Sequence, residues 1–304
     1  MPQLRFLLPI WLVVLTTGCR AFYTGEPDEL LAKGKEKREA KKYGDAIKYF
    51  RGVDEKHAES PQAEEALYLL ADTRRLNRKG QSSYQTYRRF VERYPNSRYS
   101  VAVAEGEFQL GLDHFEGRIP GFWFFGPDEK LGVTLLEHMQ LHFPNHSLAD
   151  DALVRVAEWQ IEEKEYNDAT DVLRRLLSTY PRSPHRFWAR YHLARTLWLR
   201  NAGTLYDEQL LIRSRRAFED YVATAKLAGV EDEQAERVTE AQKMIGRIDE
   251  RRSEREYENG RFYERTGYPQ SALVHYHSCV KHWPDTPAAK RSRARIGILE
   301  KVAG

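Results

Sequence analysis

One pair of histidines has a spacing that could support metal chemistry. His138 and His142 are four residues apart, so a helix would place both imidazoles on one face, where they could hold a metal ion. No glutamate completes an H-E-x-x-H frame, so an acidic ligand would have to come from elsewhere. His275 and His277 are two residues apart and would lie on different helix faces. We therefore expect no metal site, and interpret these histidines as surface or groove residues.

Other sequence signatures of enzymes are absent. The sequence has no glycine-rich phosphate loop and no G-x-S-x-G elbow. Cys279 could be a reactive thiol, but its place in the repeat pattern described below favours a packed structural cysteine. With 48 basic and 45 acidic residues the net charge is +3, which does not indicate nucleic acid as a partner. We expect no catalytic residues, no cofactor and no nucleic-acid binding.

The other cysteine, Cys19, follows a pattern typical of secretion. Arg5 precedes an apolar run over residues 7–15, and the small residues Thr17 and Gly18 stand before the cysteine. The run is shorter than the about 20 residues that a spanning helix needs. A signal that ends in Gly-Cys resembles the bacterial lipoprotein signal, in which the cysteine is acylated, for example with palmitate, and becomes the N-terminus. The alternative is an ordinary signal peptide with a chance cysteine.

The lipoprotein interpretation has consequences for the N-terminal region. It predicts a signal peptide over residues 1–18 and a lipid-anchored tether over residues 19–28. Arg20 follows the cysteine where inner-membrane lipoproteins often carry Asp, which favours the outer membrane. One departure is that Leu15 lies one position further from the cysteine than the usual leucine. If Cys19 is acylated, Cys279 is alone in the mature chain and no intramolecular disulfide can form.

The elements that must position these residues are marked by a recurring motif, Tyr94-Pro95-Asn96-Ser97. Proline ends a helix, and the following Ser or Thr can accept hydrogen bonds from the first N–H groups of a new one. The separation is 37 residues from Ala58 to Pro95 and again from Pro144 to Pro181. A helix-turn-helix period near 34 is typical of tetratricopeptide repeats (TPR). The other copies are His57–Pro61, Phe143–Ser147, Tyr180–Pro184 and Trp283–Pro287, and Pro61, Pro184 and Pro287 are expected at first helical positions.

We therefore predict an all-α fold, a TPR-like α-solenoid of about five to six helical hairpins. N-terminal repeats are expected over residues 29–146 and C-terminal repeats, ending in a basic capping helix, over residues 147–304. A long charged helix is expected over 233–258, and residues 201–204 are expected to be a loop. Small residues should stand where the two helices of a hairpin touch. These contact positions are Gly34, Ala71, Ser83, Ala157, Ala217, Gly260 and Cys279, whereas Gly80 is expected to mark a turn.

One segment interrupts the repeats, over residues 116–127. It holds four consecutive aromatic residues, Phe122, Trp123, Phe124 and Phe125, bracketed by Gly and Pro. Insertions in repeat proteins map to loops on one face, often the binding face, and aromatic anchors dominate interface energetics. We interpret these four residues as a candidate contact for a partner or substrate. The alternative is that they fold back and fill the groove between repeats.

Three stretches resemble a known family. They are Ala66–Asp72 followed by Arg89–Ser97, the segment Gly121–Gly126, and Gly260–Tyr263 followed by Trp283–Ala288. Together with the lipoprotein signal they resemble the BamD family, also called YfiO or ComL, the outer-membrane lipoproteins of the β-barrel assembly machinery. The departures are the extra length near residues 200–230, the long charged helix, and Trp283 in place of tyrosine.

This resemblance implies a function that the residues alone do not specify. It implies a non-enzymatic scaffold, anchored by lipid at the periplasmic face of the outer membrane, that assists assembly and insertion of β-barrel proteins. The implied partners are the periplasmic domains of the central barrel protein and unfolded outer-membrane protein substrates. A TPR adaptor lipoprotein for peptidoglycan, pilus or secretion machinery is the alternative, and a hydrolase on a helical platform is a third possibility without any motif to support it.

Overall fold

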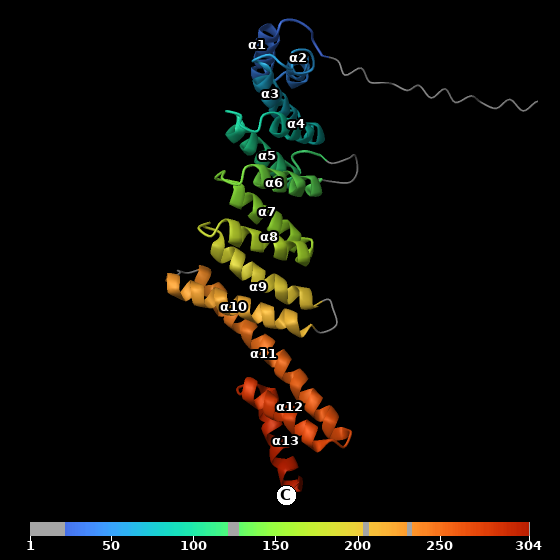
Figure 1. Cartoon of the computed structure of the whole chain (residues 1–304), viewed down its shortest axis with the longest axis vertical. Coiled ribbons are helices and arrows are strands. Elements are labelled where there is room, and N and C mark those ends of the chain that lie inside the picture. Colours follow the sequence, from blue (N-terminus) through green and yellow to red (C-terminus); the bar gives the residue numbers. More distant parts are fainter. Residues whose placement is uncertain (1–21, 121–127, 203–206, 230–232, 304) are drawn as a thin grey trace, which may run out of the picture. The chain divides into compact units, whose positions relative to one another are not determined.

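The predicted all-α fold is confirmed. A computed structural model of the protein describes residues 22–120, 128–202, 207–229 and 233–303, and within these ranges the secondary structure is helical with no strand (Figure 1). The helices are α1 (Pro27–Glu39), α2 (Tyr43–Lys56), α3 (Ala63–Leu76), α4 (Gly80–Arg93), α5 (Ser100–Phe115), α6 (Glu129–His142), α7 (Ala149–Glu162), α8 (Tyr166–Thr179), α9 (Arg186–Ala202), α10 (Glu208–Ala228), α11 (Glu233–Arg265), α12 (Pro269–His282) and α13 (Pro287–Ala303).

The chain divides into two compact units. Unit 1 is Met1–Gly132 and unit 2 is Val133–Gly304, so α6 begins in the first and ends in the second. This division follows spatial contacts, whereas the boundary expected after residue 146 follows the repeat pattern. That boundary stays a prediction, and so do the signal peptide and tether ranges.

One turn type closes three of the described hairpins. Lys41, Arg78 and Lys164 adopt φ of +57°, +55° and +63°, the left-handed conformation that ends many helices. In the first hairpin the N–H of Lys42 then donates to the carbonyl of Lys37 at 2.8 Å, as in a Schellman motif. The turn residue of the second hairpin is therefore Arg78 and not Gly80, which corrects the expectation for that glycine.

Gly80 has a different reason to lack a side chain. It is the buried first residue of α4, and a Cβ there would lie 2.3 Å from Nε2 of His114 on α5. The glycine permits two helices to approach closely, a contact between residues far apart in the sequence that the local pattern could not reveal.

In two turns between hairpins the predicted serine accepts a hydrogen bond, but within the turn that precedes the helix and not at the helix N-terminus. Oγ of Ser97 accepts the N–H of Tyr99 at 2.9 Å, and Oγ of Ser183 accepts that of His185 at 3.0 Å. These hydrogen bonds stabilise a turn that precedes the helix rather than the helix end itself. Pro287 does begin α13, but Pro61 and Pro184 lie two residues before α3 and α9, so their predicted helical positions are wrong.

The contact positions of unit 1 pack as the repeat pattern predicts. Gly34 of α1 is buried against the ring of Phe50 on α2, where a Cβ would lie 2.5 Å from the nearest ring carbon. In the second hairpin the buried Oγ of Ser83 donates to the carbonyl of Ala71 at 2.8 Å. A small residue at each site therefore lets the two helices touch.

In unit 2 the corresponding contact on α10 is Ser214 and not the predicted Ala217. Ser214 is fully buried and its Oγ donates to the carbonyl of Ala194 at 2.9 Å, the same contact that Ser83 makes. Ser214 and Ala217 are three residues apart on one helix face, so hydrophobic periodicity does not distinguish them. The expected loop at 201–204 is also corrected in part, because α9 continues through Ala202.

The last repeat is entered through one continuous helix. The predicted charged helix does not stop at residue 258, and α11 runs for 33 residues to Arg265. Gly260 within it leaves space for the ring of Tyr276, which would lie 2.5 Å from a Cβ. Cys279 is fully buried in the cluster that α11, α12 and α13 share, as its predicted contact position implies.

Candidate functional site

The predicted functional residues lie outside the residues that the structure describes. They are Phe122, Trp123, Phe124, Phe125 and the lipidation residue Cys19. What the structure describes is the base of the aromatic insertion, residues 116–120, in unit 1.

The base of the insertion is fixed to the C-terminal end of α5. Gly117 turns the chain with φ +67°, and the N–H of Ile119 donates to the carbonyl of Asp113 at 3.1 Å. The side chain of Ile119 is buried, and Nε of Arg118 donates to the Asp113 carboxylate at 2.6 Å. The chain thus leaves α5 in a defined direction just before the four aromatic residues.

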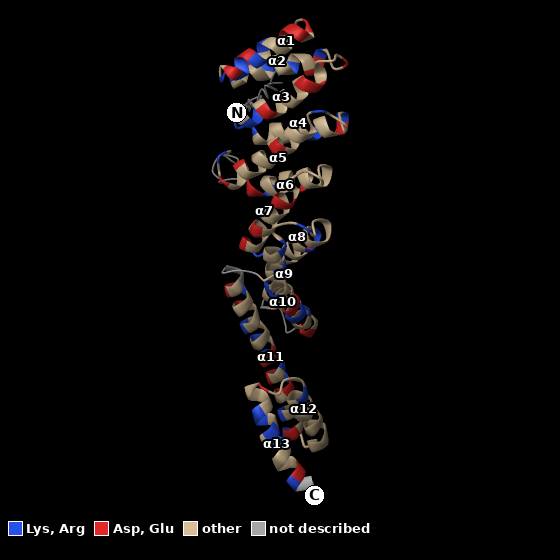
Figure 2. Ribbon diagram, turned by 90° about the vertical axis from the view of Figure 1, so that its left-hand side faces the viewer, with Lys and Arg blue, Asp and Glu red and all other residues tan. Residues whose placement is uncertain are grey.

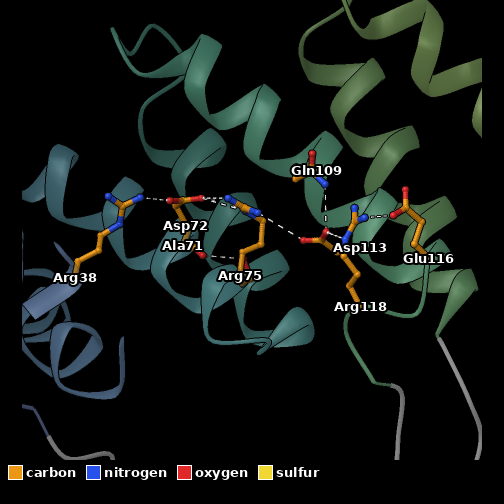
Figure 3. Close-up of polar contacts among 9 residues, drawn as sticks. Arg38, Ala71, Asp72, Arg75, Gln109, Asp113, Glu116 and Arg118 are labelled. Atoms are coloured by element: carbon orange, nitrogen blue, oxygen red, sulfur yellow. Dashed lines mark hydrogen bonds and ion pairs between the residues drawn. The ribbon is translucent and has the colours of Figure 1, made fainter. Parts of the chain in front are cut away.

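Asp113 also ends a row of alternating charges that runs across three helices (Figure 3). Arg38 on α1 pairs with Asp72 on α3, and Nη2 of Arg75 lies 2.9 Å from the same carboxylate. Nη1 of Arg75 lies 3.5 Å from Asp113 on α5, which Arg118 pairs from the other side. The row links the first helices of three successive hairpins to the base of the insertion.

The charges of this row are neutralised within it. Asp72 and Asp113 are 6 % and 8 % exposed, and each forms ion pairs with two arginines. Removing one partner of a buried ion pair costs several kcal/mol of stability, so the row holds the helices in register. It leaves no free charge for a ligand, and we interpret it as support for the insertion.

A buried histidine lies beside this support. His114 on α5 is 2 % exposed, and neither ring nitrogen has a hydrogen-bond partner among the described residues. Burial lowers the pKa of His114, while the carboxylates of Asp128 and Asp113 act in the opposite direction. The imidazole therefore packs as a neutral group against Gly80 and has no role as a ligand in this state.

The other chemistry-bearing residues do not assemble into a site. The rings of His138 and His142 lie together, with centroids 4.2 Å apart, but no group of three or more metal-ligating side chains occurs in the described ranges. Nδ1 of His275 lies 3.1 Å from Glu256. Sγ of Cys279 is buried 3.5 Å from the carbonyl of Ser253, and burial raises the pKa of this thiol, so it is a packed cysteine.

Polar cavities form instead between neighbouring hairpins. In unit 1 a cavity of about 310 Å³ lies between α2, α3 and α4, and its basic lining residues are Arg51, Arg74, Lys79 and Arg89. Figure 2 shows Lys and Arg interspersed with Asp and Glu on the helices of both units. This cavity departs from that balance, because only two acidic residues, Asp54 and Glu55, line it.

A second cavity, of about 390 Å³, lies in unit 2 between α6, α7 and α8. Its lining has three acidic residues and one basic residue, together with Gln160 and Val172. Gln160 is 5 % exposed, and its Oε1 has no hydrogen-bond partner among the described residues. The charged residues are Glu137, Asp168, Asp171 and Arg175.

Neither cavity was predicted from the sequence, although the repeat period contained a signal. Once the hairpins are aligned by their turns, equivalent residues can be compared, and their charges differ between copies. Which residues line a cavity depends on the faces of three helices at once, and this requires the structure. Among the described residues, no helix is long and apolar enough to cross a membrane.

The chain was compared with known proteins. A tetratricopeptide repeat model matches residues 65–97, which include most of α3 and all of α4. No curated protein matches the chain. Solved structures include MamA, at 16 % identity and a TM-score of 0.36 over 66 % of this chain and 92 % of that one. A tetratricopeptide repeat protein from Parabacteroides merdae has 13 % identity and a TM-score of 0.35 over 90 % of this chain and 98 % of that one. PilW, described as a widely conserved type IV pilus biogenesis factor, has 14 % identity and a TM-score of 0.29 over 87 % of this chain and 97 % of that one.

The decisive match is to a family model. The model of the YfiO family, described as outer membrane lipoprotein, matches residues 128–299, from the start of α6 into α13. This range covers more than half of the 304 residues and includes the hairpins that carry the second cavity. The protein therefore belongs to the YfiO family of outer membrane lipoproteins, as the sequence resemblance predicted.

Proposed function

We propose that the protein is a non-enzymatic scaffold that assists the assembly and insertion of β-barrel proteins in the outer membrane. The observation that supports this most directly is the YfiO family match over residues 128–299. Repeated helical hairpins are typical of scaffolds, because side chains from successive repeats form extended binding surfaces. The expected partners are the periplasmic domains of the central barrel protein and unfolded barrel substrates.

The attachment that this role requires would come from Cys19. We propose that the cysteine is acylated and holds the protein at the periplasmic face of the outer membrane. A lipid on this residue would supply the anchor.

We further propose that Phe122, Trp123, Phe124 and Phe125 contact a partner or substrate. Support comes from the base of the insertion, where Asp113 and Arg118 fix the chain as it leaves α5. A rigid base reduces the conformational entropy that an aromatic anchor loses on binding. Packing of these residues into a groove between repeats remains the alternative that the experiment below separates.

The test is recovery of partners from membranes. The tagged, lipidated protein is purified from gently solubilised outer membranes, and we expect to recover a barrel protein with periplasmic repeat domains. Recovery of pilus or secretion components or of peptidoglycan enzymes in its place would refute the assembly role and indicate the adaptor alternative.

The same experiment with Trp123→Ala/Phe125→Ala tests the insertion. If these rings are anchors, affinity for the recovered partner falls by more than about 2 kcal/mol, or about 30-fold. Arg98→Gln, an exposed change elsewhere in unit 1, serves as the control. Unchanged binding with a lower unfolding temperature would show that the rings belong to the core.

A further inference from the structure

The cavities of units 1 and 2 occupy equivalent positions in the repeat. The turn at Pro95 recurs 86 residues later at Pro181. The same offset of 86 relates each of the six residues that line the unit 2 cavity to a residue that lines the unit 1 cavity. The pairs, unit 1 first, are Arg51 with Glu137, Arg74 with Gln160, Ser82 with Asp168, Gln85 with Asp171, Thr86 with Val172, and Arg89 with Arg175.

The lining charge is reversed between these equivalent cavities. Four basic and two acidic residues line the cavity of unit 1, a formal charge of +2. One basic and three acidic residues line that of unit 2, a formal charge of −2. At the six equivalent positions alone, unit 1 has three basic residues and unit 2 has three acidic residues and one basic residue, so the two cavities are suited to different ligands.

The cavity of unit 1 shows which group fits this position. The guanidinium of Arg74 extends from α3 over the start of α4, where Nη1 donates to Oγ1 of Thr86 and, at 3.3 Å, to the carbonyl of Ser82. A side chain of the protein itself therefore places a cation there.

In unit 2 the cation at the Arg74 position is missing. The one basic lining residue, Arg175, pairs with Glu137 at 3.0 Å, so Asp168 and Asp171 account for the acidic surroundings. Gln160 replaces the arginine with a shorter, uncharged side chain, and Val172 removes the hydroxyl acceptor. Asp168 replaces the serine and has no ion-pair partner among the described residues, while Asp171 is 3.5 Å from Arg174, a long contact between exposed side chains. The buried Oε1 of Gln160 is left as an acceptor without a donor.

We propose that the unit 2 cavity binds the guanidinium of an arginine side chain on a partner polypeptide. The guanidinium would donate to Oε1 of Gln160 and face the carboxylates of Asp168 and Asp171, in the position that Arg74 fills in unit 1. Its planar set of five N–H donors can reach an amide oxygen and two carboxylates at once, which a lysine ammonium cannot do in one plane. The inference rests on the proposed role as a binding scaffold and specifies the chemistry of the segment that is bound.

The experiment uses blocked arginine, N-acetyl-arginine methylamide, as the probe. It is titrated into the purified full chain with isotope-labelled isoleucine and valine methyl groups. The Val172 methyl signals report on the unit 2 cavity, and that of Ile47 reports on the unit 1 cavity in the same spectrum. We expect saturable shifts at Val172, little change at Ile47, and little change with blocked citrulline, the neutral isostere of arginine.

Two variants test the contacts. Gln160→Arg supplies an internal guanidinium, as Arg74 does in unit 1, and should weaken binding about tenfold or more. Asp168→Ser/Asp171→Gln, which installs the unit 1 residues at exposed positions that cannot unfold the core, should have a similar effect. Glu162→Gln, an exposed charge removal on α7 outside the cavity, should bind as the unchanged protein does.

The outcomes are distinct. Equal shifts with arginine and citrulline, equal shifts at Val172 and Ile47, or unchanged binding by both variants would overturn the proposal. Arginine binding at Val172 without recovery of a barrel protein from membranes would uphold the cavity and refute the assembly role. Recovery of a barrel protein by a chain that does not bind arginine would uphold the assembly role and refute the arginine site.

Discussion

His192 on α9 should make unit 2 sensitive to mild acid. Its ring lies against those of Trp188 and Tyr191, with centroids 4.4 and 5.3 Å away. Nδ1 is buried without a hydrogen-bond partner among the described residues. Burial lowers the pKa of His192 to about 4, and the positive charges of Arg195 and Arg237 act in the same direction.

The sign and size of the effect follow from proton linkage. A histidine whose pKa is lower in the folded protein binds its proton more readily when unfolded, so stability falls as the pH drops below the unfolded value of 6.5. With a folded pKa of about 4, the group lowers the free energy of unfolding by about 2 kcal/mol between about pH 7.5 and about pH 5. Below about pH 4 the folded imidazole is also protonated and no further loss arises from it.

The assay compares His192→Gln with the unchanged protein in urea unfolding at both pH values. Tryptophan fluorescence reports mainly on unit 2, because Trp159, Trp188, Trp198 and Trp283 belong to it. The variant should lose about 2 kcal/mol less than the unchanged protein on acidification. Contributions of the other titrating groups are common to both chains and cancel in the difference.

A control and a direct measurement complete the test. His277→Gln removes an exposed histidine and should leave the acid sensitivity as it is. The ring proton resonance of His192, followed by NMR in the unchanged protein, gives the folded pKa whatever the stability of the variant. A folded pKa near 6.5, or equal acid sensitivity in the His192 variant and the unchanged protein, would refute the reasoning.

Three further outcomes are expected. Gly34→Ala should lower the free energy of unfolding by about 1–3 kcal/mol, because its Cβ would lie 2.5 Å from the Phe50 ring. The control Gly44→Ala, which has nothing within 4 Å, should stabilise α2 slightly. Equal effects of the two changes in urea unfolding would contradict this reasoning. Asp72→Asn should lower the free energy of unfolding of unit 1 by about 2–4 kcal/mol, because it leaves two arginines without their carboxylate. A decrease below about 0.5 kcal/mol would show that the row of charges contributes little to stability. Cys19→Ser should release the protein into the soluble periplasmic fraction, and persistent membrane attachment would count against acylation.

The repeat architecture could be predicted because its signals are local. Proline in the turns and small residues at fixed offsets specify where helices end and touch, and Gly34 packs against Phe50 as that register requires. The predictions were wrong where a contact with a residue distant in the sequence determines the role of a position. Gly80 serves an approach by His114, and Ser214 meets a carbonyl on another helix. The hydrophobic periodicity of a single helix reveals neither of these contacts with another helix.

The candidate site was less predictable than the fold. The insertion could be recognised by its aromatic residues, but the residues that hold its base, Asp113 and Arg118, lie five positions apart in a segment without regular spacing. The cavities needed the joint arrangement of three helices, and the repeat offset then identified their equivalent residues. Sequence therefore indicates which positions correspond, and structure shows which of them surround a common space.

Separation along the chain distinguishes structural charges from charges available to a ligand. Contacts between successive hairpins recur at a separation of 34 residues, as in Arg38 with Asp72, Asp151 with His185, and Arg215 with Asp249. A polar residue with a partner one repeat away is engaged in holding its hairpins together. Asp168 has no such partner among the described residues, and it lines a cavity whose equivalent contains an arginine. In a scaffold of repeated hairpins, a cavity-lining charge that does not join two repeats is therefore the one to examine for binding, and Asp168 is such a charge among the described residues.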